Sequence, residues 1–268
     1  MNPKICIIGC GWLGFPLAKK LIESGYNIHG TTTSENKIEH LKNADISPFL
    51  IRFSPEGISG NLKACLSNCQ ILIINIPPGL RQNKELDYVQ KMKHLLFEVE
   101  TSSIENVLFI GSTSVYDDDI TCPVITEDSP TSKSKIASKL LDVEGQFQKS
   151  KHFKTTILRF SGLFAEDRHP ATYLSGKTQL KNAKTPVNLI HRDDCILIIL
   201  KLIENQVWNH IFNASTTPHP CKKDYYTSVC RRLEMPIPEF DNSSMSKGKV
   251  IDSTKLVQLL NYNFKVKL

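Results

Sequence analysis

Residues 5–14 read ICIIGCGWLG, and this stretch decides the fold. The apolar run 5–8 is typical of a buried strand. It breaks into Gly9-x-Gly11-x-x-Gly14, after which apolar residues recur at helical spacing over residues 15–22. A strand, a glycine turn and a helix start in this order match the fingerprint of a dinucleotide-binding βαβ unit.

The three glycines each have a physical reason. Gly9 permits the tight turn, Gly11 lets the backbone approach a pyrophosphate, and Gly14 lets the helix pack close to the strand. The helix N-terminus, at Trp12 and Leu13, offers N–H groups and a partial positive charge to phosphates. We therefore predict that these five residues bind a nucleotide. The alternative is a tight turn that binds nothing.

The composition indicates a globular protein with a full core. The chain has 268 residues, of which 40% are hydrophobic and 22% are charged, so it forms one large domain or a main domain with an appendage. No apolar run reaches membrane-spanning length. The opening lysine and apolar run resemble a signal peptide, but the glycine pattern and helical spacing predict that the mature chain starts at Met1. The net charge is +6 with scattered lysines, which argues against nucleic acid as a partner.

The eight cysteines do not suggest a disulfide framework or a metal site. A chain of this length builds its own core, and most of the cysteines lie in apolar runs or on expected helices. Cys65 and Cys69 are four residues apart, with no CxxC and no paired histidines nearby, so zinc is not expected. A reducing cytoplasm fits this cysteine usage.

The second strand, residues 26–32, is expected to end near the ribose of the adenosine. An acidic residue at this point would mark NAD. The chain instead places small and hydroxyl-bearing residues there, namely Gly30, Thr31, Thr32, Thr33 and Ser34. Together with Lys37 they leave room for a 2′-phosphate, so NADP is favoured over NAD. Glu35, next to a predicted helix N-cap at Ser34, could bend back to a ribose, which keeps NAD open.

The following segments complete a doubly wound sheet. Strands are predicted at residues 48–53, 71–75 and 106–112, with helices at residues 62–69 and 83–100 between them. Asn75, Ile76 and Pro77 come at the carboxyl end of the strand 71–75, at the switch point where such sheets bind ligands. The blander role of the prolines is to stop the strand. We predict an α/β fold, a doubly wound parallel sheet of the Rossmann type.

The domain organisation follows from this order of elements. Residues 1–160 are expected to form the NAD(P)-binding Rossmann domain. Residues 161–268 are expected to form a smaller C-terminal part that is mainly substrate-binding. Some stretches are expected to return to the main sheet, among them residues 157–160 and 210–215.

Six stretches in one order resemble a known family. They are GSTSVY (111–116), TEDSP (126–130), TTILRFSGLFAEDRHP (155–170), VNLIHRDDC (187–195), HIFNAS (210–215) and KVIDSTKLVQLLNYNF (249–264). Their order is similar to that of the extended short-chain dehydrogenase/reductase superfamily, of the NAD-dependent epimerase/dehydratase type. The glycine spacing departs from this branch, because Gly9 and Gly11 are two apart where the family usually has three, which indicates an atypical subgroup.

The resemblance implies roles for individual residues. Ser112 corresponds to the residue that polarises the substrate oxygen, and Tyr116 is the tyrosine of the "VY" motif. The family also has a Tyr-x-x-x-Lys dyad on the next helix, whose lysine tunes the tyrosine pKa. The helix expected at residues 133–147 contains no tyrosine. The proton donor would then be Tyr116, a lysine of this helix, or water.

Depending on register, the dyad positions are occupied by Ile136 and Leu140 or by Lys135 and Lys139. A Tyr-x-x-x-Lys match does occur at Tyr173 and Lys177. A short motif of this kind is expected about once by chance in such a sequence, so we interpret this match as a coincidence.

Two charged stretches farther along have separate interpretations. Arg168, in a loop before Pro170, is a candidate contact for a phosphate or carboxylate of the substrate, although an exposed loop charge is more often only solvated. Asp193 and Asp194 precede an apolar helix, where N-capping explains them better than catalysis.

The leading hypothesis is an NAD(P)-dependent oxidoreductase or an epimerase/dehydratase-like enzyme. Its substrate would be small and polar, with nucleotide-linked compounds included, and it would lack the family's dyad at its usual place. The alternative is a non-catalytic NAD(P)-binding sensor or partner protein. The expected partners are a small molecule and, from the resemblance, a second copy in a homodimer, without metal, nucleic acid or membrane.

Overall fold

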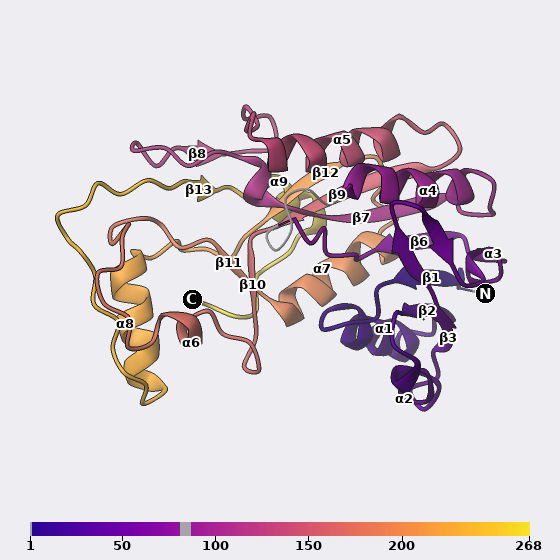
Figure 1. The fold of residues 1–268 in the computed structure, drawn as a ribbon, viewed down its shortest axis with the longest axis horizontal. Helices are drawn as coiled ribbons and strands as arrows, with labels where there is room; N and C mark the ends of the chain where they lie inside the picture. The colour runs from indigo at the N-terminus through magenta and orange to yellow at the C-terminus, as the bar shows by residue number, and fades with distance from the viewer. Residues whose placement is uncertain (1, 81–86) are drawn as a thin grey trace. The chain divides into compact units, whose positions relative to one another are not determined.

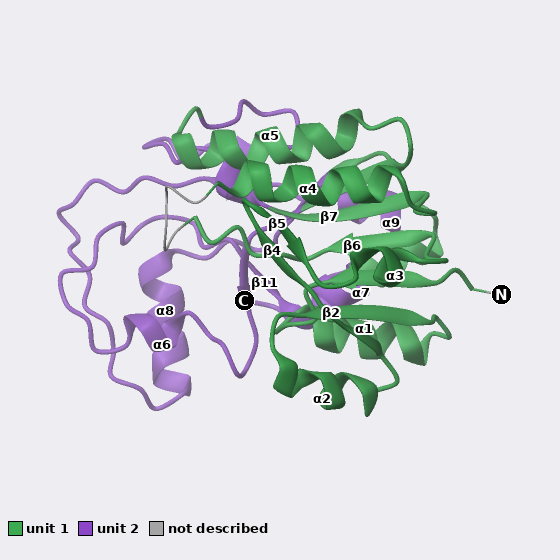
Figure 2. Ribbon diagram, turned by 45° about the vertical axis from the view of Figure 1, so that its right-hand side comes forward, with its two compact units in different colours: residues 1–111, 133–158, 199–211 green, residues 112–132, 159–198, 212–268 purple. Residues whose placement is uncertain are grey.

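A computed structural model describes residues 2–80 and 87–268 (Figure 1). The chain divides into two compact units, which Figure 2 shows in different colours. Unit 1 comprises residues 1–111, 133–158 and 199–211, and unit 2 comprises residues 112–132, 159–198 and 212–268. The units therefore interleave along the chain. We expected residues 1–160 and 161–268 to form two parts, with some stretches of the second returning to the main sheet, and β12 (Ile211–Ala214) does lie in that sheet. Interleaving arises because strands that are distant in sequence pair side by side in one sheet.

A seven-stranded parallel sheet confirms the predicted α/β fold of the Rossmann type. Its order is β12-β9-β7-β6-β1-β2-β3, so the chain leaves β1 first in one direction and then in the other. The switch point lies between β1 and β6, where Ile8 pairs with Ile74. The strands are β1 (Ile5–Ile8), β2 (Ile28–Thr32), β3 (Ser47–Leu50), β6 (Ile71–Ile74), β7 (Asn106–Ser112), β9 (Lys154–Phe160) and β12 (Ile211–Ala214).

Helices cover both faces of the sheet in unit 1. Side chains alternate along β1, so Cys6 and Ile8 join the core cluster on the face covered by α3, α4 and α5. Ile5 and Ile7 are fully buried and point the other way, and Figure 2 shows α1 and α2 on the opposite side of the sheet from α4 and α5. The helices are α1 (Gly14–Glu23), α2 (Ile38–Lys42), α3 (Leu62–Leu66), α4 (Tyr88–Glu100) and α5 (Lys135–Lys149). Residues 83–86 of the predicted helix 83–100 lie outside the described residues.

The predicted third strand is divided into two elements. β3 ends at Leu50, and after Ile51 the chain forms an antiparallel hairpin of β4 (Arg52–Ser54) and β5 (Gly57–Ser59). Residues 48–53 are apolar except for Arg52, and this pattern did not indicate the break. Gly60 permits the return of the chain, since it has a φ of +99° and a Cβ there would lie 2.1 Å from the carbonyl oxygen of Leu50.

Unit 2 has a small core of its own. Buried residues from β10, β11 and α8, among them Phe164, Leu189 and Val229, pack together. Two parallel strand pairs, β10 with β11 and β8 with β13, lie in this unit. Its elements are β8 (Val124–Ile125), β10 (Gly162–Phe164), β11 (Leu189–His191), β13 (Val250–Ile251), α6 (Ala171–Leu174), α8 (Lys222–Arg232) and α9 (Thr254–Leu260). Helix α7 (Arg192–Glu204) has residues in both units, and short 3-10 turns occur at Glu35–Lys37 and Thr113–Val115.

The two aspartates at the start of α7 do not cap it as predicted. The ring nitrogen Nδ1 of His191 accepts the backbone N–H of Asp193 at 3.2 Å. The buried Asp194 instead accepts hydrogen bonds from the Tyr262 hydroxyl and from the backbone N–H groups of residues 265 and 266. Asp194 therefore anchors the C-terminal segment, a role that depends on residues seventy positions away and leaves no local signal.

None of the helices within residues 2–80 and 87–268 is long and apolar enough to cross a membrane. All eight cysteines are free thiols. In the same ranges, no three histidine, cysteine or acidic side chains are grouped so that they could hold a metal ion.

Candidate functional site

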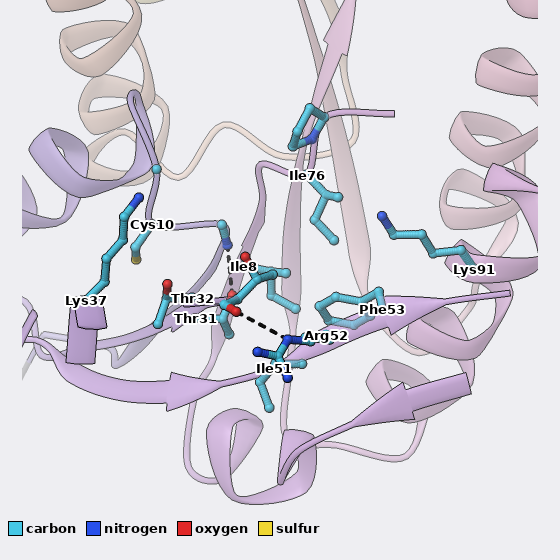
Figure 3. Close-up of a pocket in the computed structure, with 14 residues that line it drawn as sticks. Ile8, Cys10, Thr31, Thr32, Lys37, Ile51, Arg52, Phe53, Ile76 and Lys91 are labelled. Atoms are coloured by element: carbon cyan, nitrogen blue, oxygen red, sulfur yellow. Dashed lines mark hydrogen bonds between the residues drawn. The ribbon is translucent and has the colours of Figure 1, made fainter. Parts of the chain in front are cut away.

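Unit 1 contains a pocket of about 450 Å³ at the carboxyl ends of β1, β2 and β6 (Figure 3). This is the edge of a doubly wound sheet where ligands bind, next to the switch point. The lining residues come from the glycine turn, the end of β2, the β4–β5 hairpin, the segment after β6 and α4. They are Ile8, Gly9, Cys10, Gly11, Thr31, Thr32, Thr33, Lys37, Ile51, Arg52, Phe53, Ile76, Pro77 and Lys91.

The glycine turn has two close-packed glycines and one open one. Gly9 has a φ of +103°, and a Cβ there would lie 2.4 Å from the carbonyl oxygen of Asn75. A Cβ at Gly14 would lie 2.1 Å from the carbonyl oxygen of Gly9. Gly11 is exposed, and a Cβ there would meet no atom within 4 Å. The turn thus leaves free space above Gly11, at the point where a pyrophosphate is predicted.

Two polar side chains hold the turn in this shape. The Thr31 hydroxyl accepts the backbone N–H of Gly9 at 2.9 Å, and the Asn75 amide donates to the carbonyl oxygen of Gly9 at 3.0 Å. Thr32 is buried, and its hydroxyl accepts the backbone N–H of Ser34 at 3.2 Å. The hydroxyl oxygens of Thr31 and Thr32 thus accept hydrogen bonds from the backbone. Thr33 is exposed, so it is the threonine best placed to meet a ligand.

Some of the other predicted nucleotide-binding residues line the pocket and some do not. Ile76 and Pro77 line the pocket. Trp12, Leu13 and Gly14 do not line it, and Leu13 is buried at the position before the first residue of α1. Their contact with a nucleotide stays a prediction.

Three cations line the pocket: Lys37, Arg52 and Lys91 (Figure 3). The Arg52 Nε–H donates to the carbonyl oxygen of Thr33 at 3.2 Å. Lys91 is half-buried on α4, and burial lowers its pKa from the ordinary value. Among the described residues that line the pocket there is no aspartate or glutamate, and Glu35 is not one of them. The site therefore suits a ligand with negative charge.

Arg52, Phe53, Ile51 and Lys91 are pocket residues that the sequence interpretation missed. Three of them lie within residues 48–53, which we predicted as one strand, and that prediction gave no reason to place them in a pocket. Lys91 lies in the middle of an amphipathic helix, and only the packing of α4 brings it to the pocket.

Tyr116 lies in a buried hydrogen-bonded chain in unit 2. Its hydroxyl donates to the Asn213 Oδ1 at 3.1 Å and accepts from the Arg159 Nη1 at 2.6 Å, and the side chain is 2% exposed. Burial raises the pKa of Tyr116, although the Arg159 guanidinium opposes this effect. The contacts fit a structural role better than proton donation.

Ser112 is the last residue of β7 and is partly exposed. Its hydroxyl oxygen accepts the backbone N–H of Ser114 at 3.2 Å, which starts the 3-10 turn that follows. The hydroxyl proton can still be donated, so the residue remains a candidate for polarising a substrate oxygen.

The positions of the family's dyad hold no phenol in either register. On α5, Ile136 and Leu140 pack against the core of unit 1. The chance match at Tyr173 is 67% exposed, and α6 ends at Leu174. Tyr173 and Lys177 therefore do not share a helical face.

Arg168 is exposed in the loop after β10, where its backbone forms a bridge with Ala165. In the same loop Asp167 forms an ion pair with Arg192 at 3.1 Å, and the Glu166 carboxylate lies 3.3 Å from the His191 Nε2. Arg168 thus belongs to a loop of mixed charge, and its contact with a substrate stays a prediction.

A family model described as "NADP oxidoreductase coenzyme F420-dependent" matches residues 4–82, which include the glycine turn. Among solved structures, UDP-glucuronic acid 4-epimerase from Bacillus cereus in complex with NAD is 18% identical, with a TM-score of 0.78 over 98% of this chain and 94% of that one. A short-chain dehydrogenase/reductase superfamily protein from Agrobacterium tumefaciens with bound NAD is 15% identical, with a TM-score of 0.76 over 98% and 93%. At these identities the likeness shows a shared fold.

A relative with higher identity is protein YeeZ of Escherichia coli strain K12. The two sequences are 30% identical over 265 residues, which is 97% of this chain and 95% of the relative. The similarity therefore extends well beyond the glycine turn and includes both units. On this basis the chain belongs to the family of the Escherichia coli protein YeeZ.

Proposed function

We propose that the protein is an NADP-dependent oxidoreductase or epimerase/dehydratase-like enzyme of the extended short-chain dehydrogenase/reductase type. The observation that carries the proposal is the pocket of unit 1, where an open glycine turn and three cations, with no acidic side chain among its described lining residues, face one cavity. Its substrate would be a small polar compound, with nucleotide-linked sugars as the first class to test.

The residues of the pocket fit a dinucleotide with an added phosphate. The space above Gly11 and the start of α1 would take the pyrophosphate. Phe53 and Ile76 offer apolar surface to a base. Lys37 and Arg52, near the end of β2, would meet the 2′-phosphate that distinguishes NADP from NAD.

Two of the comparisons support the chemical class. The matching family model describes NADP oxidoreductases. The epimerase of similar fold acts on a nucleotide-linked sugar and carries NAD. A nicotinamide cofactor supplies hydride transfer when it is bound, and the protein supplies position and polarisation. In this chain Ser112 would donate a hydrogen bond to the substrate oxygen, and Arg168 would bind an anionic group of the substrate.

A non-catalytic sensor of NAD(P) is the second candidate, and a specific observation favours it. The Tyr116 hydroxyl is buried in a hydrogen-bonded chain. The dyad positions on α5 hold Ile136 and Leu140 in one register and Lys135 and Lys139 in the other, so neither register has a tyrosine. A protein that only binds the cofactor would need no proton donor.

Titration calorimetry with NADP and NAD, followed by absorbance at 340 nm with candidate substrates, tests the proposal. We expect NADP to bind more tightly than NAD and hydride transfer to depend on Ser112. Tight NADP binding without turnover on any sugar nucleotide or small carbonyl compound would favour the sensor. No binding of either dinucleotide would overturn both candidates.

A further inference from the structure

We infer that the β4–β5 hairpin selects NADP over NAD, with Arg52 as the residue that binds the 2′-phosphate and His94 as the residue that holds the hairpin in place. The inference rests on the proposed function, since it names the selective element of the same pocket. A doubly wound sheet does not require a hairpin between its third strand and the helix that follows. An antiparallel hairpin interrupts the path from β3 to α3, and its first strand lines the pocket.

The hairpin is a small antiparallel unit that packs on the core. Arg52 pairs with Ser59, Phe53 with Ile58 and Ser54 with Gly57. The Ser54 hydroxyl donates to the carbonyl oxygen of Gly57 at 3.2 Å and so closes the turn. Phe53 and Ile58 pack against the core cluster that includes buried side chains of α4. An isolated two-stranded hairpin is marginal in water, so its geometry depends on this support.

Arg52 is oriented toward the end of β2 by its own hydrogen bond. Its Nε–H donates to the carbonyl oxygen of Thr33, which holds the guanidinium at the residue that follows β2. The remaining N–H groups of Arg52 have no acceptor among the described residues. A guanidinium presents its donors in a planar fork that matches two oxygens of a phosphate. The adenosine 2′ position is expected at this strand end.

His94 connects the tip of the hairpin to α4. Its Nε2 lies 3.0 Å from the carbonyl oxygen of Pro55. A carbonyl oxygen only accepts, so the Nε2 carries the proton and donates to Pro55. The Gln90 amide, 3.3 Å from the same nitrogen, then cannot donate to it. The bond links the turn of the hairpin to α4. Lys91, three residues before His94 on the same helix, also lines the pocket.

The experiment compares two fragments of the cofactor on the full-length protein. Adenosine 2′,5′-bisphosphate carries the 2′-phosphate, and adenosine 5′-monophosphate lacks it, so the ratio of their dissociation constants isolates this one contact. We would measure both by calorimetry for the wild type and for Arg52→Gln, Arg52→Lys, His94→Leu and His94→Gln. Lys93→Gln, which removes a charge from α4 outside the pocket, and His152→Leu, at an exposed histidine, are the matched controls.

We expect Arg52→Gln to weaken binding of the bisphosphate about tenfold to hundredfold, as for loss of a hydrogen bond between charged groups, with the monophosphate unchanged within about twofold. Arg52→Lys should recover part of the loss, because a lysine keeps the charge but not the fork. His94→Leu should lower the same ratio, and His94→Gln should restore it, since the glutamine amide can donate to Pro55. An equal loss for both fragments would indicate general damage to the pocket.

The inference fails if Arg52→Gln or His94→Leu keeps the wild-type ratio, or if both fragments weaken equally. In that case NADP preference in the wild type would still support the proposed function and would point to Lys37. If the wild type binds neither NADP nor NAD, the proposed function itself fails. Circular dichroism and the thermal midpoint of each variant confirm that it is folded.

Discussion

Gly11 and Gly14 should respond to substitution in opposite ways, although they belong to one motif. Gly11→Val is expected to abolish NADP binding and leave the fold intact. Gly14→Ala is expected to destabilise unit 1. The difference follows from the space around each residue. A Cβ at Gly11 meets nothing within 4 Å, whereas a Cβ at Gly14 would lie 2.1 Å from the carbonyl oxygen of Gly9, which is backbone and cannot rotate away.

The expected magnitudes follow from these distances. Gly11 is exposed, so Gly11→Val should change the free energy of unfolding by less than about 0.5 kcal/mol. Its branched side chain would fill the space that the pyrophosphate needs, which should cost at least about 2.7 kcal/mol of binding, or a hundredfold in Kd. At Gly14 the turn must move to relieve the overlap. Overpacking of this kind costs about 1–3 kcal/mol, more than the helix propensity gained from alanine.

Urea denaturation followed by circular dichroism gives the free energy of unfolding, and calorimetry with NADP gives Kd. Leu259→Ala, at a side chain that is 44% exposed in unit 2, serves as a neutral control for both measurements. If Gly11→Val binds NADP as tightly as the wild type, the pyrophosphate does not lie over this turn. If Gly11→Val unfolds as easily as Gly14→Ala, the open space above Gly11 is not a property of the folded protein.

Three further predictions concern unit 2. Tyr116→Phe should lower the free energy of unfolding by about 1–3 kcal/mol, because the buried Arg159 loses a hydrogen-bond acceptor, and should leave NADP binding unchanged in calorimetry. Asp194→Asn should destabilise by about 2 kcal/mol or more in urea denaturation, because an amide N–H would face the donors of the C-terminal segment, including the Tyr262 hydroxyl. Burial lowers the pKa of His169, so the stability it contributes is complete above about pH 6.5 and decreases as the pH falls; His169→Gln should reduce this decrease in denaturation curves at pH 7.5, 6.5 and 5.5.

The parts of the fold that could be predicted from sequence are those whose signals are local. The run 5–8, the glycines and the helix that follows form one contiguous pattern, and the structure has β1, the turn and α1 at these residues. The strands 71–74 and 106–112 are short, apolar and bounded by turn residues, so their assignments were close. For each of these elements, the residues at its two ends indicate where it begins and ends.

Non-local contacts account for the rest. Thr31 was expected to face a ribose, but its hydroxyl holds the backbone of Gly9, twenty-two residues earlier. Lys91 reaches the pocket only because α4 packs on the sheet. Arg52 lies inside the predicted strand 48–53, and its position in the pocket depends on a hairpin that this prediction did not include.

The hydrogen bonds of Tyr116 bear directly on whether this side chain can donate a proton. An Asn213 Oδ1 can only accept, so the phenol proton is committed to that bond, and the phenol oxygen is committed to Arg159. Releasing the proton would break the buried bond to Asn213, in a position where burial already raises the pKa of Tyr116, whereas the Arg159 guanidinium would stabilise the phenolate. The burial of this phenol and its bond to Asn213 therefore favour a structural role for Tyr116 over proton donation. The other proton donors that we predict, a lysine of α5 or water, are the first to test. Ser112, which is partly exposed and has a hydroxyl proton to donate, is tested in the role of polarising the substrate oxygen.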